Sequence, residues 1–511
     1  MKIVKRVVLG LLLATAATRM LLYFCYALDI TIPYEAFHLE SKMILLAYRV
    51  QAGDTLYPDW QHYPHVANFF GPVYFVVVGL IGRLVHADLT GLVVIGRAVT
   101  FSAALITTML IAIYVKRTCG WWAAVAAGMV TLGVSPLYGF SVMARADLLA
   151  ETIGTAGFLL AIQKGPRLRY LGCVVLALAV LTKQTSAVFM LGAALAHFFD
   201  GARREALTVF VTTSALVVLA IVLITALREP RFATDFLGEG KTPWLFPAWL
   251  QQFKRILVAA PDLLAIPFMA LLLVRLRGGR EPALLGLTLV VATSCLVLSA
   301  KRGADLNYYL NLRVCEGLAM GILCKYALTA TATKWDLSLS NLGVLVAAGC
   351  LVPGTAFAVI PAHSAWQKYE FRRTSSFRSL VRTHDRLFEM AENPKIRLLT
   401  DSGLIDLHQR ERAAFGDQWL FRMLVETGRI EPTKMKEWIE AEDYDIIVTT
   451  SDLLLPGYKT YEFGLPMVLV ESIKKHYVSA GTLNSFFIYN RKGAARASLP
   501  NGIGSTAPRV P

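Results

Sequence analysis

Two glutamates near the start of the chain have the chemistry of a general base. Glu35 and Glu40 lie in DITIPYEAFHLESKMILLAYRVQAGD, where apolar residues recur at helical spacing directly after a long apolar run. A carboxylate held at an apolar boundary is partly desolvated, so it binds a proton more readily and can take one from a substrate hydroxyl. A solvated amphipathic helix would show the same pattern, so the spacing alone leaves both interpretations open.

A third carboxylate stands at the junction of two apolar runs. Asp147 follows Arg145 by two residues in ARADLLAETIGTAGF. Charges so placed are costly unless they are paired or face water, so they indicate a functional site. The alternative is an Arg-Asp pair that only pins two helices together.

Two further polar segments interrupt the apolar sequence. Lys183 and Gln184 lie in LAVLTKQTSAVF, where a lysine can neutralise a phosphate as a point charge and an amide can donate to its oxygens. A lysine that only snorkels to the membrane surface would look the same. If several loops bring cation and amide donors to one face of the membrane, together they suit an amphiphilic anion better than any one loop would alone. The other segment, KRGADLNYYLNLR, adds Lys301, Arg302, Asn307 and Tyr308.

Histidines and cysteines do not predict a metal site. His38, His62 and His65 share one loop but lack the His-x-x-x-His spacing that places two ligands on one helical face. The seven cysteines lie in or beside apolar segments and form no CxxC pair. The chain also has no Walker loop and no GxGxxG turn, so the sequence predicts neither a nucleotide nor a particular metal.

The composition predicts a multi-spanning membrane protein. Of 511 residues, 55% are hydrophobic and 17% charged, and the mean hydropathy is +0.52. The net charge of +15 arises from basic residues in short loops between apolar runs. Cytoplasmic loops of membrane proteins carry such an excess, so the charge does not indicate a nucleic-acid partner.

The apolar runs of the chain suggest about 11 candidate transmembrane helices, for a bilayer of about 30 Å that takes about 20 residues to cross. A further run at 72–86 is shorter and carries Arg83. If this run does not cross, nearly every basic cluster falls on the side of the N-terminus, so we interpret it as an interfacial or re-entrant helix and the N-terminus as cytoplasmic. The predicted spans are 7–27, 98–115, 121–140, 147–163, 170–182, 186–199, 206–227, 261–276, 282–299, 310–328 and 339–361.

The composition changes after residue 360. IRLLTDS, YDIIVTT and SFFIYNR read as short strands, and SLVRTHDRLFEMAEN, QWLFRMLVETG and PTKMKEWIEAE as helices. We therefore expect an all-α membrane domain at 1–361, a small α/β extracytoplasmic domain at 364–494, and a disordered tail at 495–511.

Four segments in the first 360 residues, taken in order, resemble the polytopic GT-C glycosyltransferases, and in particular the branch with aminoarabinose transferases and protein O-mannosyltransferases. They are ESKMILLAYRVQAGDTLYPDWQHYPHVANFFGPVYF, ARADLLAETIGTAGFLLA, LAVLTKQTSAVFMLGAALA and NYYLNLRVCEGLAMG. The resemblance implies an inverting transfer of a sugar from a polyprenyl phosphate to a hydroxyl of a cell-envelope glycan, lipid or protein, outside the inner membrane of a bacterium.

The resemblance also implies roles for single residues. Glu40 matches the family's acidic base best and Glu35 second, and Asp147 matches an aspartate that helps to arrange the site. The first loop departs from the family pattern, because the usual Asp-Glu pair is replaced by the two separate glutamates, so the base stays open between them. Use of a divalent cation also stays open. The residues expected to contact the donor's phosphate or sugar are Arg145, Lys183, Gln184, Lys301, Arg302, Asn307, Tyr308, Tyr57, His62 and Tyr63.

Two other functions compete with the enzyme. A transporter or flippase of lipid-linked sugars would also place ionisable residues in interrupted helices. A non-enzymatic subunit of an envelope assembly would use the C-terminal domain as a binding module. The clustering of the polar residues at the outer ends of the predicted spans favours the enzyme.

Overall fold

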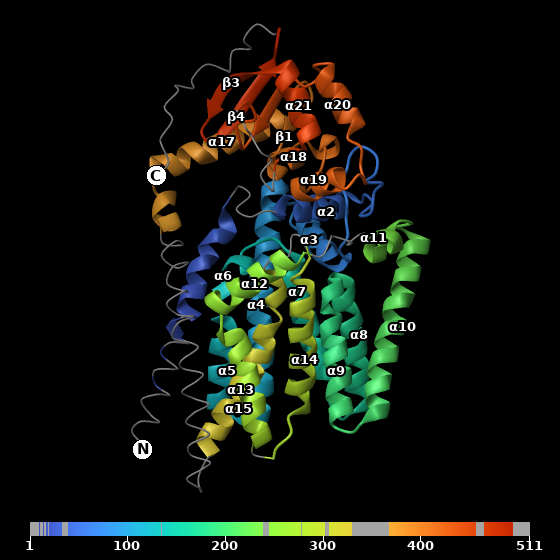
Figure 1. Ribbon diagram of the computed structural model, residues 1–511, viewed down its shortest axis with the longest axis vertical. Helices are drawn as coiled ribbons and strands as arrows, with labels where there is room; N and C mark the ends of the chain where they lie inside the picture. Colours follow the sequence, from blue (N-terminus) through green and yellow to red (C-terminus); the bar gives the residue numbers. More distant parts are fainter. Residues whose placement is uncertain are drawn as a thin grey trace.

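The computed structural model describes residues 20–32, 39–133, 135–238, 245–276, 278–301, 306–329, 367–455 and 464–493, together with residues 10, 14, 17 and 18. Helices dominate the first 329 residues, and a small mixed domain follows from residue 367 (Figure 1). The predicted boundary at 361–364, the predicted tail 495–511 and the predicted span 339–361 lie outside the described residues, as does Glu35.

The helical part forms an elongated bundle (Figure 1). Its longest members are α4 (Leu89–Cys119) and α10 (Arg203–Leu227), and most of the bundle helices begin and end close to the predicted apolar runs. The others are η1 (Tyr26–Thr31), α5 (Trp121–Leu132), α6 (Ser135–Ser141), α7 (Ala146–Ala161), α8 (Pro166–Thr182), η2 (Gln184–Ser186), α9 (Ala187–Phe199), α11 (Phe232–Gly238), α12 (Phe246–Ala259), α13 (Asp262–Leu276), α14 (Pro282–Leu298), η3 (Leu306–Tyr309) and α15 (Leu312–Thr329).

The number of membrane spans is not confirmed by this structure. In the described part of the chain, two helices, α4 and α10, are both long and apolar enough to cross a membrane. A third span is possible if α12 and α13, which meet at a bend of 77°, are counted as one. Several other helices, among them α5 and α14, are apolar but shorter, so the helix lengths of the described residues leave the prediction of about 11 spans unconfirmed.

The helix α4 begins earlier than the sequence predicted. The side chain of Asp88 accepts a hydrogen bond from the backbone N–H of Gly91 at 2.7 Å and so caps the first turn. The helix therefore starts at Leu89, nine residues before the predicted span at 98. Arg97 consequently lies inside the helix and is fully buried.

Two helices of the first loop lie between the bundle and the C-terminal domain (Figure 1). They are α2 (Glu40–Ala52) and α3 (Val73–Leu84), and the second is the helix predicted for the run at 72–86. The two helices pack closely at Gly79. A Cβ there would lie only 2.5 Å from the carbonyl oxygen of Ala47, so the contact requires a residue without a side chain. The side chains of Leu80 and Leu84 in α3 are exposed.

The C-terminal domain contains a four-stranded sheet with the order β1-β2-β4-β3. The strands β1 (Leu398–Thr400) and β2 (Ile446–Thr449) are parallel, and β4 (Phe486–Arg491) pairs antiparallel with both β2 and β3 (Tyr477–Leu483). The three predicted strands are present, whereas β3, whose pairing with β4 is interrupted between Ser479 and Gly481, was missed. The helices are α17 (Ser375–Glu392), α18 (Gly403–His408), η4 (Arg410–Arg412), α19 (Gln418–Glu426), α20 (Thr433–Glu440) and α21 (Met467–His476).

The C-terminal domain packs directly on α2. A Cβ at Gly403 would lie 2.1 Å from Oγ of Ser41, and one at Gly416 would lie 2.8 Å from Cδ2 of Leu45. The hydroxyl of Ser41 donates to the carbonyl of Gly416 at 3.0 Å. Glycines at both positions allow this close approach, so α2 belongs to the interface between the two domains.

Candidate functional site

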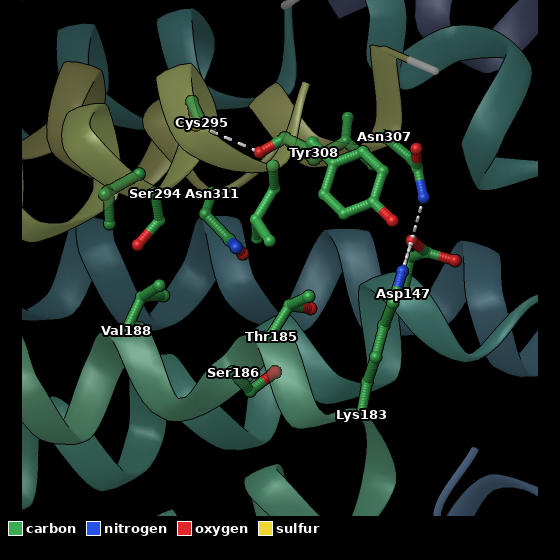
Figure 2. Close-up of a pocket in the computed structure, with 13 residues that line it drawn as sticks. Asp147, Lys183, Thr185, Ser186, Val188, Ser294, Cys295, Asn307, Tyr308 and Asn311 are labelled. Atoms are coloured by element: carbon green, nitrogen blue, oxygen red, sulfur yellow. Dashed lines mark hydrogen bonds and ion pairs between the residues drawn. The ribbon is translucent and has the colours of Figure 1, made fainter. Parts of the chain in front are cut away.

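A small, partly open pocket lies among the ends of four bundle helices (Figure 2). Its polar side chains come from segments that are far apart in sequence, namely the start of α7, the break between α8 and α9, the end of α14 and the region of η3. It is lined by Asp147, Lys183, Thr185, Ser186, Val188, Val291, Ser294, Cys295, Leu298, Asn307, Tyr308, Leu310 and Asn311.

Asp147 is the centre of the polar wall of this pocket. Its Oδ1 accepts hydrogen bonds from Nζ of Lys183 and from Nδ2 of Asn307, the second at 2.8 Å (Figure 2). Its Oδ2 pairs with Nε of Arg145 at 3.2 Å. One carboxylate thus joins two cations and an amide that come from three different elements.

Local backbone geometry places these side chains at helix ends. Asp147 lies in the first turn of α7, where the helix dipole favours a negative charge. The segment before it is held because the hydroxyl of Thr100, in α4, donates to the carbonyl of Arg145 at 3.2 Å. Lys183 has an extended backbone (φ −153°, ψ 128°) between α8 and η2, so its side chain leaves the helix and reaches Asp147.

Aromatic rings flank the ammonium group of Lys183. Nζ lies 5.5 Å from the ring centroid of Tyr308 and 6.0 Å from that of Phe70. Both distances are within the range of a cation–π interaction. The lysine is therefore oriented by two rings as well as by Asp147.

The loop that carries Phe70 is pressed against the end of α8. A Cβ at Gly71 would lie only 1.6 Å from the carbonyl oxygen of Leu181, two residues before Lys183. The amide of Gln184 donates to the carbonyl of Phe69 at 2.6 Å. The loop that carries Phe70 and the segment of Lys183 are thus held together by a close backbone approach and by a hydrogen bond from the Gln184 side chain.

The substitution Gly71→Ala tests the close contact between Gly71 and the carbonyl of Leu181. We expect the substitution to lower the free energy of unfolding by about 1–3 kcal/mol, because an added methyl in a tightly packed site forces the backbone to shift. Gly165→Ala is the matched control, since nothing lies within 4 Å of the added atom there. Chemical denaturation of the two variants provides the measurement, and equal stabilities would contradict the contact.

Glu40 lies next to this site but is engaged elsewhere. Its carboxylate forms a bidentate pair with Arg97, with Nε–Oε1 at 2.8 Å and Nη2–Oε2 at 2.7 Å, and both side chains are buried. Oε1 also accepts the backbone N–H of Ala144 at 2.9 Å, three residues before Asp147. Glu40 lies outside the lining of the pocket and supports the segment that carries Asp147.

Other predicted contact residues lie in different places. Tyr57 is buried and donates to the carbonyl of Phe70 at 2.7 Å, and Tyr63 donates to the carbonyl of Arg412, in the C-terminal domain, at 2.9 Å. His62 is exposed beside Asp59. In the described part of the chain, the lining of the pocket includes neither these three residues nor Arg145, Gln184 and Lys301. Glu35 and Arg302 lie outside the described residues.

Several residues of the site were missed from the sequence. Thr185, Ser186, Ser294 and Asn311 line the pocket, but isolated hydroxyl and amide groups in apolar runs are too common to indicate a site. Arg97 carried a usable signal, because it is an ionisable residue inside GLVVIGRAVTF and such a residue needs a partner.

The residues of the pocket do not form a metal site. Among the described residues, no group of three or more His, Cys, Asp or Glu side chains comes together. The carboxylate that lines the pocket, Asp147, already pairs with two cations. We therefore derive no step of a reaction through a divalent cation.

The fold is shared with solved membrane glycosyltransferases. The crystal structure of ArnT, an aminoarabinose transferase, from Cupriavidus metallidurans in the apo state superposes with a TM-score of 0.57 at 14% identity, covering 94% of this chain and 97% of that chain. The chain has the GT-C fold. The same ArnT bound to undecaprenyl phosphate matches with a TM-score of 0.57 at 14% identity, covering 94% of this chain and 98% of that one.

A more distant GT-C protein supports the same conclusion. The Archaeoglobus fulgidus oligosaccharyltransferase, crystallised with a tethered acceptor peptide, gives a TM-score of 0.51 at 12% identity over 94% of this chain and 74% of that one. No family model matches the chain, and no curated protein matches it by sequence. The predicted resemblance is confirmed by the fold, and the GT-C fold with its apolar helices indicates an integral membrane protein.

Proposed function

We propose that this protein is a membrane glycosyltransferase that moves a sugar from a polyprenyl phosphate to the hydroxyl of an extracytoplasmic acceptor, which is a glycan, lipid or protein of the cell envelope. The observation that carries this proposal is the group Asp147–Lys183–Asn307 on the wall of a pocket in a GT-C fold. A related fold, that of ArnT, has been crystallised with undecaprenyl phosphate. A lysine with amide and hydroxyl neighbours suits the phosphate of such a lipid.

In the proposed reaction, the acceptor oxygen attacks the anomeric carbon of the donor and inverts its configuration. The bond between that carbon and the phosphate oxygen breaks, and its electron pair stays on the phosphate. Lys183 and Asn307, with Arg302 from the same loop, stabilise this growing charge. Asp147 orients both Lys183 and Asn307 before the donor binds, because its Oδ1 is their common acceptor.

The acceptor's proton goes to a carboxylate of the first outer loop. Glu40 and Glu35 remain the candidates, and Glu40 would have to exchange its contacts with Arg97 to receive a proton. Asp147 is less suited as the base, because Lys183, Asn307 and Arg145 already donate to its two oxygens. The rate of sugar transfer by Glu40→Gln combined with Arg97→Met shows which of the two glutamates is the base.

The placement in the membrane belongs to the same proposal. With a cytoplasmic N-terminus, the pocket, the first loop and the C-terminal domain lie on the outer face of a bacterial inner membrane. The partners are then membrane lipids, the polyprenyl-linked donor and an envelope acceptor, without nucleic acid.

The direct test is sugar transfer by the purified full chain in proteoliposomes. The vesicles carry polyprenyl phosphates bearing a panel of labelled sugars, and envelope fractions are added outside as acceptors. We expect label to move from lipid to acceptor with wild-type protein and not with Asp147→Asn. Movement of the labelled lipid across the bilayer without transfer would instead identify a flippase, and neither activity with any sugar of the panel would favour a non-enzymatic subunit.

A further inference from the structure

A line of side chains connects the C-terminal domain to the pocket. It begins with Asp417, whose Oδ2 pairs with Nζ of Lys42 at 3.5 Å, where both side chains are buried. Nζ of Lys42 lies 5.4 Å from the ring centroid of Phe70, and Nζ of Lys183 lies 6.0 Å from the same centroid. One aromatic ring is therefore shared by a lysine that contacts the C-terminal domain and a lysine that lines the pocket.

The end of this line in the C-terminal domain is fixed. Asp417 caps α19, because its Oδ1 accepts the backbone N–H of Leu420 at 3.0 Å. Burial lowers the pKa of Lys42, and the nearby Asp417 carboxylate opposes this effect by favouring the charged lysine. The charge that faces the ring of Phe70 thus depends on a residue of the C-terminal domain.

The backbone of Phe70 is fixed as well. Its carbonyl accepts the hydroxyl of Tyr57 at 2.7 Å, and its N–H donates to Oδ1 of Asn68 at 3.0 Å. The next residue, Gly71, abuts the carbonyl of Leu181. With its backbone held in this way, the ring of Phe70 is a fixed contact for both ammonium groups, beside the carboxylates of Asp147 and Asp417 and, for Lys42, the ring of Phe69 at 5.5 Å.

We propose that Lys42 and Phe70 are positioning residues through which the C-terminal domain, by means of Asp417, holds Lys183 in place for the phosphate of the donor. This role deepens the proposed function and rests on it. It gives the C-terminal domain a role in donor binding, because a change at Asp417 reaches Lys183 through three contacts in series, with Lys42 and Phe70 between them. Loss of one cation–π contact is expected to weaken binding of the lipid phosphate about 3- to 10-fold.

The first measurement is binding of undecaprenyl phosphate to the purified full chain. Phe70→Leu, Lys42→Met and Asp417→Asn are each expected to raise the Kd about 3- to 10-fold, whereas Phe70→Tyr, which keeps the ring, should bind like the wild type. An asparagine still caps α19, so Asp417→Asn removes the charge and not the helix start. Ser41→Ala is the matched control, because it removes a hydrogen bond between α2 and the C-terminal domain and leaves Lys42 paired.

A double variant tests whether the effect passes through the ring. If Lys42 acts through Phe70, Lys42→Met combined with Phe70→Leu should bind as weakly as Phe70→Leu alone. If the rise in Kd of the double variant equals the product of the two single rises, Lys42 does not act through Phe70. A Kd for Ser41→Ala as high as that for Lys42→Met would also overturn the proposal.

A second measurement needs no substrate. The rate at which acetic anhydride acetylates Lys183, followed by mass spectrometry, should rise at least threefold in Phe70→Leu and Asp417→Asn and stay unchanged in Ser41→Ala. Equal rates in all variants would overturn the connection even if the lipid binds. If the wild type does not bind the lipid but the labelling differences are present, the proposed function is refuted. The coupling between Asp417 and Lys183 would still hold.

Discussion

Replacing Lys183 with methionine is expected to lower the rate of sugar transfer by about 10²- to 10³-fold, because a donor aimed at developing negative charge contributes on that order to catalysis. The fold should survive the change. Asp147 keeps Asn307 at 2.8 Å and Arg145 at 3.2 Å, so its carboxylate is not left without a partner. The measurement is the initial rate of transfer from a labelled polyprenyl-phosphate donor, with thermal unfolding recorded in parallel.

Lys164→Met is the matched control for this prediction, since Lys164 is exposed between α7 and α8. Its rate should equal that of the wild type. A Lys183→Met protein that transfers sugar at the wild-type rate would remove the lysine from the phosphate site and would leave the pocket without the cation on which the proposed function depends.

Glu40→Gln is expected to lower the free energy of unfolding by about 3–5 kcal/mol, which is the usual cost of removing one partner from a buried ion pair. Arg97 is fully buried, and a neutral amide cannot balance its charge. The side-chain oxygen of a glutamine at this position can still accept the N–H of Ala144, so the change affects mainly the charge. Urea denaturation with a probe of helix content provides the measurement.

A double variant separates this structural role from a chemical one. Glu40→Gln combined with Arg97→Met removes both charges and should recover most of the lost stability, because a buried pair can often be replaced by neutral residues of similar size. If the double variant is stable but transfers sugar at least 10²-fold more slowly, Glu40 is the base. If its rate stays within tenfold of the wild type, the base is Glu35, and Glu35→Gln should then show the large loss.

Much of the fold could be predicted from the apolar pattern. Runs of apolar residues located the bundle helices to within a few residues, and alternating or continuous short runs located three of the four strands. Two errors came from local details that the pattern does not contain. The cap at Asp88 extends α4 by nine residues, and β3 was missed because its pairing is interrupted between Ser479 and Gly481.

Part of the candidate site could be predicted, because its residues lie at the ends of apolar helices. Asp147, Lys183 and Asn307 all interrupt apolar runs, and charged or amide groups at such interruptions need partners whatever the fold. The sequence does not show which partners these groups pair with. Asp147 meets Asn307 across 160 positions of the sequence, and Glu40 meets Arg97 across 57.

The sequence by itself determined that the chain is rich in apolar helices, that a mixed domain follows them, and that a few carboxylates and cations must be satisfied at the helix ends. The tertiary structure alone decided that Glu40 pairs with Arg97 beside the pocket, while Asp147 gathers the donors of the pocket wall. The physical reason is that hydrophobic periodicity specifies which face of a helix is buried, whereas the pairing of buried charges depends on how distant helices pack against one another.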